Sequence, residues 1–149
     1  MLRIRSDQVE VAVLDRSGGD ISTAANRGAA ESDASAQTSS VFAVGYSQVA
    51  LTIDLTTVGS ATTLYVAFRS SGMETPGVDT ASDWSYYAID DIDKATGVSA
   101  TQPYEIEIPV DGVRRYTRMV PVWGSHVSAL VWADGAGARG IVYAQRLGV

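Results

Sequence analysis

The feature that most constrains the fold is the alternation of apolar and polar residues from about residue 47 onward. In the run SQVALTIDL every second residue is a large apolar one: Val49, Leu51, Ile53 and Leu55. Successive side chains of a β-strand point to opposite faces of a sheet, so a period of two is typical of strands that bury one face. The pattern predicts β-sheets, and no segment has the spacing of an amphipathic helix.

Six further runs are also predicted to be strands: TLYVAFR, SDWSYYAID, YEIEIPV, RRYTRMVPVW, HVSALVWAD and RGIVYAQRL. Turn residues separate several of them, at 58–61, Asp111-Gly112, Gly124-Ser125 and 133–139. Such glycine-containing turns favour β-hairpins, so we expect consecutive strands to pair antiparallel. Pro121 cannot donate a hydrogen bond to a neighbouring strand, which predicts an edge strand or a bulge at that position.

The N-terminal part of the chain has a different character. The run QVEVAVL (8–14) is a candidate eighth strand with Val9, Val11 and Val13 on one face. The stretch AANRGAAESDASAQTSS (24–40) that follows has no large apolar side chain and is typical of disorder, because it has little to bury. An ordered conformation of this stretch would therefore need contacts from outside its own side chains. These contacts would come either from the β-domain or, as we favour, from a neighbouring subunit.

Together these segments predict an all-β fold. About eight short strands with glycine-rich turns are typical of a jelly-roll-like antiparallel β-sandwich, and 149 residues suffice for one such core. We assign residues 1–45 to an extended N-terminal arm, which includes the strand at 8–14 and the Ala/Ser-rich segment. Residues 46–149 form the predicted β-sandwich domain.

Composition excludes several classes of function. The chain has no cysteine, so disulfides, thiolate metal sites and cysteine nucleophiles are absent. The net charge of -6, without a basic stripe, argues against direct nucleic-acid binding. The start MLRIRSDQVEV lacks the apolar run of a signal peptide, and no window has the length of a membrane span. We therefore expect a soluble protein.

Candidate catalytic residues are few. His126 is the only histidine, and no nucleophile-elbow sequence accompanies it, so we interpret it as a surface or turn residue. Glu105 and Glu107 have the chemistry of a glycosidase pair, but alternation explains both as the wet face of a strand. We expect no catalytic residue and no cofactor.

Two other groups of residues have binding chemistry. Asp90, Asp91 and Asp93 begin like a calcium loop, but Ala95 replaces the third oxygen ligand and no glutamate closes the loop, which favours a solvated loop. The tryptophans fit core packing best, then a subunit interface, and then a sugar-stacking platform. They are Trp84, Trp123 and Trp132.

Three segments indicate a family: SQVALTIDLTTVGSATTLYVAFRSS, SDWSYYAID and SHVSALVWADGAGARGIVYAQRLGV. Because of these three segments, the part from about Tyr46 to Val149 resembles small jelly-roll structural proteins of tailed bacteriophages. These are the decoration or cement proteins of heads and related minor virion proteins. The resemblance implies a structural role with no catalytic residue to carry over. It also implies homo-oligomers, commonly trimers, that bind other virion proteins through loops and a terminal arm.

The favoured hypothesis is a non-enzymatic decoration protein on the capsid surface of a virion, assembled in the host cytoplasm. It would stabilise the head by binding across major capsid subunits, without contacting nucleic acid or membrane. A tail, hub or baseplate component of the same fold and a carbohydrate-binding β-sandwich module are alternatives. Deleting residues 1–40 should weaken capsid association and leave the β-domain folded. The expected partner-binding residues are Leu2, Ile4, Val9, Val11, Val13 and Arg27.

Overall fold

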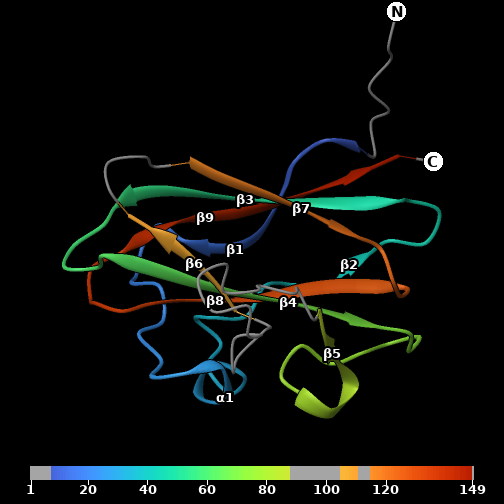
Figure 1. Cartoon of the computed structure of the whole chain (residues 1–149), viewed down its shortest axis with the longest axis horizontal. Coiled ribbons are helices and arrows are strands. Elements are labelled where there is room, and N and C mark those ends of the chain that lie inside the picture. Colours follow the sequence, from blue (N-terminus) through green and yellow to red (C-terminus); the bar gives the residue numbers. More distant parts are fainter. Residues whose placement is uncertain (1–7, 88–104, 111–114, 149) are drawn as a thin grey trace, which may run out of the picture.

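The protein is a sandwich of two antiparallel sheets (Figure 1). A computed structural model describes residues 8–87, 105–110 and 115–148. One sheet has the order β1 (Val11–Arg16), β9 (Arg139–Leu147), β3 (Gln48–Thr57) and β7 (Arg115–Pro121). The other sheet has the order β2 (Val41–Phe42), β8 (His126–Ala133) and β4 (Thr63–Ser71). Both β5 (Ser85–Tyr86) and β6 (Glu105–Pro109) pair with the edge of β4 that faces away from β8. This is the strand order of a jelly roll, so the predicted fold class is confirmed.

The hairpins predicted at the short turns, however, are wrong, although the consecutive strands β4 and β5 do pair antiparallel. The turn at Gly124-Ser125 joins β7 to β8, and 133–139 joins β8 to β9, yet each of these pairs is split between the two sheets. The turn at 58–61 likewise separates β3 from β4, and Asp111-Gly112 lies outside the described residues. The same turn residues suit a hairpin and an arch between sheets, because both reverse the chain within a few residues. Pairing is decided over longer range, and β3 pairs with β7 and β9.

The core lies between the sheets and consists of the predicted alternating residues. On β3 the residues at every second position from Val49 to Leu55 are at most 5% exposed, and on β4 Leu64, Val66 and Phe68 are equally buried. Burial of each such side chain contributes roughly 1.5–3 kcal/mol. Pro121 ends β7, which pairs only with β3 among the described strands, so the prediction of an edge strand is confirmed.

Residues 8–45 lie against the sandwich, and the prediction that they form an extended arm is corrected. Strand β1 pairs with β9 of the same chain. The backbone of Thr38 donates to the Ala129 carbonyl at 3.0 Å, and Val131 donates to the Ala36 carbonyl at 2.8 Å. These bonds fix residues 36–38 beside β8.

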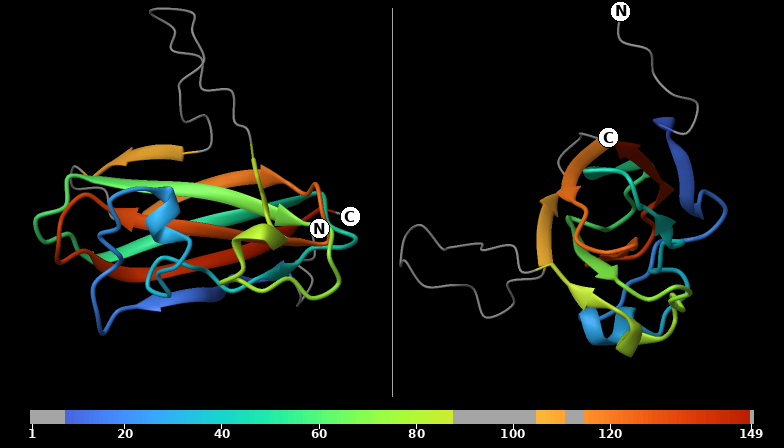
Figure 2. Two further views of the ribbon diagram at one scale, coloured as in Figure 1. Left: turned by 90° about the horizontal axis from the view of Figure 1, so that it is seen from below. Right: turned by 90° about the vertical axis from the view of Figure 1, so that its right-hand side faces the viewer.

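The alanine-rich stretch supplies a second, smaller core on the outer side of β4 and β8. Asn26 caps the N-terminus of the single-turn helix α1 (Arg27–Ala30), because its side chain accepts a hydrogen bond from the Ala29 backbone. Ala30 and Ala36 are fully buried against three outward-facing sheet residues: Ala67, Leu130 and Trp132. Figures 1 and 2 show α1 below this sheet, on the side away from the other sheet. Small side chains let the segment lie close to the sheet.

A bulge in β1 changes which residues face the core. Ala12 pairs with Tyr143 and Leu14 with Val142, so Val13 is an extra residue in the strand. A bulge re-aims the side chains around it. Val13 is consequently buried at 8% exposure, while Val11 is 57% exposed. The prediction that Val9, Val11 and Val13 share one face is therefore wrong.

Candidate functional site

Exposed apolar side chains gather at one end of the sandwich. Phe42, Val44, Met73 and Trp123 are each about half exposed or more, from 48% to 64%. Phe42 ends β2, and the other three lie on the loops that follow β2, β4 and β7. These loops meet at the right-hand end of the molecule in Figure 1. We call these four residues the apolar end.

Hydrogen bonds hold the three loops together. The Ser125 hydroxyl bridges to the carbonyl oxygens of Ser71 at 3.1 Å and Met73 at 3.0 Å. The Ala43 backbone donates to the Ser125 carbonyl at 2.8 Å, and the Phe42 ring contacts the His126 ring edge-on with centroids 5.3 Å apart. The apolar end is therefore built on a fixed backbone.

Trp123 is the most exposed large residue of the apolar end, at 64%. Its ring stacks on Tyr87 with centroids 4.5 Å apart. The buried Tyr87 hydroxyl donates to the Pro121 carbonyl at 2.7 Å, and burial raises the pKa of that hydroxyl above its ordinary value. Tyr87 thus stays neutral and holds one face of the indole while the rest faces solvent.

The other two tryptophans are core residues. Trp84 is 7% exposed and donates through Nε1 to the Gly77 carbonyl, and the guanidinium of the fully buried Arg69 lies 4.8 Å from its ring centre. Trp132 is 2% exposed and stacks on Tyr65. Neither presents an open ring face, so a sugar platform on Trp84 or Trp132 is ruled out.

The predicted partner-binding residues differ in how far they are exposed at the surface. Val9 and Val11 are exposed. Just before them, the Gln8 side chain donates to the Gly148 carbonyl, and the Gln8 carbonyl accepts from the Gln145 side chain. Val13 is buried in the protein's own core, and Leu2 and Ile4 lie outside the described residues.

Arg27 acts within its own chain. Its guanidinium lies 4.3 Å from the centre of the Tyr86 ring and 3.8 Å from a Glu31 carboxylate oxygen. The Tyr86 hydroxyl donates to the same carboxylate at 2.5 Å. These contacts fasten α1 to β5, which gives Arg27 a role in packing.

No catalytic arrangement forms around the candidate residues in the described part of the chain. His126 begins β8, directly after the turn, and its Nδ1 lies 3.0 Å from the Ser125 hydroxyl, with no carboxylate bonded to it there. Glu107 is exposed on β6. Among the described residues no three His, Asp or Glu side chains come together as a metal site, and the cluster of Asp90, Asp91 and Asp93 lies outside them.

Sequence reasoning missed Phe42, Val44 and Met73. They stand in short segments of sequence without sustained alternation, so no periodicity marked them. None of the helices within the described ranges combines the length and hydrophobicity needed to span a bilayer. No protein-family model, curated protein or solved structure matches the chain.

Proposed function

We propose that the protein is a non-enzymatic virion component of a bacteriophage, a decoration protein that binds the capsid surface through its apolar end. The observation that carries the proposal is Trp123, a largely exposed aromatic residue held rigidly by Tyr87 among other exposed apolar side chains. Tryptophan is enriched among the residues that dominate binding energy in protein interfaces. Exposed apolar patches of this kind mark interaction sites.

The sandwich suits such a role for physical reasons. Its strands give a rigid frame, and the contacts of the apolar end lie on loops, where binding residues usually lie. A capsid repeats the same surface by symmetry, so many modest contacts add up. Exposed Val9 and Val11 at the edge strand β1 provide a second apolar surface for a neighbour.

Binding to purified capsids that lack the protein tests the proposal. We expect cosedimentation of the wild-type chain and a loss of affinity of about tenfold or more for Trp123→Ala, as for an interface hot spot. Met119→Ala is the matched control, because Met119 is 50% exposed on β7 but lies outside the apolar end. Absence of wild-type binding, together with absence from purified virions, would refute the proposal.

Copy number separates head from tail. Quantified in intact particles, a head protein should be present in hundreds of copies and a tail component in few, because closed shells repeat their subunits many times. A glycan array read by tryptophan fluorescence tests the carbohydrate alternative at Trp123. A sugar that quenches wild-type fluorescence, with no capsid binding, would favour that alternative.

A further inference from the structure

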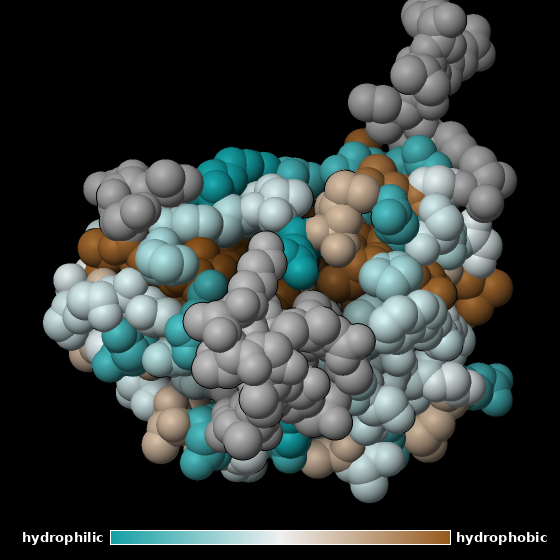
Figure 3. All heavy atoms as spheres, viewed as in Figure 1, coloured by the Kyte–Doolittle hydropathy of each residue, from teal (hydrophilic) through white to brown (hydrophobic). Residues whose placement is uncertain are grey.

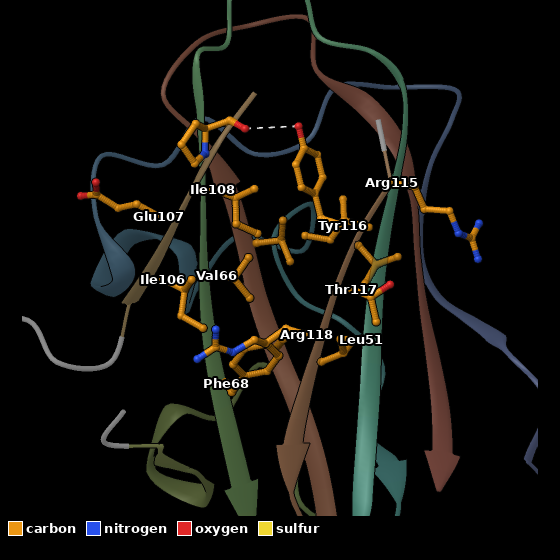
Figure 4. A pocket seen from close by; sticks show the side chains of 15 residues that line it. Leu51, Val66, Phe68, Ile106, Glu107, Ile108, Arg115, Tyr116, Thr117 and Arg118 are labelled. Atoms are coloured by element: carbon orange, nitrogen blue, oxygen red, sulfur yellow. Dashed lines mark hydrogen bonds between the residues drawn. The ribbon is translucent and has the colours of Figure 1, made fainter. Parts of the chain in front are cut away.

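The structure contains a cavity that the proposed docking role does not use. It has a volume of about 520 Å³ and lies between the two sheets, beside β6 and β7 (Figure 4). Sites for small molecules typically occupy about 300–1,000 Å³ and are mostly apolar. The size of this cavity is within that range.

The walls of the cavity are apolar. Leu51 of β3, Val66 and Phe68 of β4, and Ile106 and Ile108 of β6 form its sides. Its floor reaches Ala129, Val131 and Val142, in the middle of the sandwich. Such a lining suits an aliphatic chain, whose burial is favourable in proportion to its area.

The cavity opens where the sandwich is not closed by pairing. In the described part of the chain β6 pairs only with β4, and β7 only with β3. The Tyr116 hydroxyl donates to the Pro109 carbonyl at 3.2 Å and so bridges the two strands at one point. Figure 3 shows hydrophobic residues at the surface in a band between the two layers.

A cationic side chain lies at this opening. Arg118 lies opposite Leu51 in the strand pairing, and alternation along β7 puts it on the same face as Tyr116 and Val120, toward the other sheet. An arginine at such a position lines the cavity while its side chain stays exposed.

Within the described residues, Arg118 forms no hydrogen bond or ion pair that would neutralise its charge. Neighbouring Arg115 contrasts with it, because it pairs with Glu10 at 2.7 Å and Asp54 at 3.0 Å. Glu107 also lines the cavity, but its carboxylate points away from it in Figure 4.

We propose that this cavity binds the aliphatic chain of a single-chain anionic amphiphile of the fatty-acid type, with its carboxylate paired to Arg118. An apolar chain fits a floor that reaches the centre of the sandwich, and a cation at the mouth complements an anionic head. An added β-strand from a partner fits less well, because the Tyr116–Pro109 bridge crosses the gap between the two edges. Inward-pointing charges also protect edge strands from aggregation, and that role alone would give no ligand binding.

Calorimetric titration of the full chain with dodecanoate, below its micelle concentration, tests the proposal. We expect saturable binding of one molecule per chain, weakened about tenfold by Arg118→Gln. Arg139→Gln is the charge-matched control, because Arg139 is an exposed arginine paired with Asp20 and does not line the cavity. The affinity of the Arg139→Gln variant for dodecanoate should stay within about twofold of that of the wild-type chain. Dodecyltrimethylammonium, with the same chain and the opposite charge, should bind more weakly than dodecanoate.

A second variant tests the position of the chain. Ile106→Trp places a larger side chain in the cavity from the half-buried Ile106 of β6 and should abolish binding, with folding checked by circular dichroism. Absence of saturable dodecanoate binding to wild type, or affinity unchanged by Arg118→Gln, would overturn the proposal. Self-association that Ile106→Trp removes, without dodecanoate binding, would overturn it in favour of strand addition.

Discussion

At the scale of single residues, the alanines within residues 24–40 show what composition does not reveal. Ala29 and Ala30 are neighbours in α1, but Ala29 is exposed and Ala30 is fully buried against the outer face of β8 and β4. Ala30→Leu should therefore lower the free energy of unfolding by about 1–3 kcal/mol through overpacking. Ala29→Leu should change it by less than about 0.5 kcal/mol, as is usual at the surface. Urea denaturation of both variants measures the difference, and equal effects would contradict the observed packing.

At the scale of elements, the loop around α1 depends on a carboxylate. Asp33 accepts hydrogen bonds from the Ser22 hydroxyl at 2.6 Å and from the Ser35 hydroxyl at 2.7 Å. Burial raises the pKa of Asp33, but these bonds outweigh it, and the net pKa lies below the ordinary value. The ionised form is therefore favoured by folding. The stabilisation from the ionised Asp33 carboxylate is present above the pKa of an aspartate in the unfolded chain, about 3.9. It is lost as the pH falls through the lower pKa of Asp33 in the folded chain.

Asp33→Asn should accordingly lower stability near pH 7 by about 1 kcal/mol, and its difference from wild type should shrink below about pH 4. Denaturation followed from pH 7 to pH 3 measures this. Asp79→Asn is the control, because Asp79 is exposed and makes no hydrogen bond with the described residues. A constant difference between Asp33→Asn and wild type at all pH values would show that the carboxylate charge is not the cause.

Elements also show where sequence reasoning succeeds and where it stops. Alternation located β3, β4, β8 and β9, because a half-buried strand needs that pattern in its own residues. It did not locate β2, which has two residues, or the bulge at Val13, which depends on the partner strand β9. Of the candidate site, Trp123 was named among the aromatics, but its exposure follows from loops that meet only in the folded chain.

At the scale of the whole molecule, residues 8–40 are integral to the sandwich. They supply β1 as the neighbour of β9, the buried Ile21, and the cover over Leu130 and Trp132.

The sequence predicted that a chain without residues 1–40 would stay folded, and the structure predicts the opposite. The shortened chain should lose its cooperative unfolding transition and aggregate, because an apolar sheet face and a strand edge become exposed. In the full chain, the double substitution Val9→Ser with Val11→Ser should keep the transition, since both side chains are already exposed. Thermal unfolding by circular dichroism compares the three proteins. A shortened chain that unfolds cooperatively near the wild-type temperature would restore the arm interpretation and return residues 8–40 to the surface that contacts a neighbour.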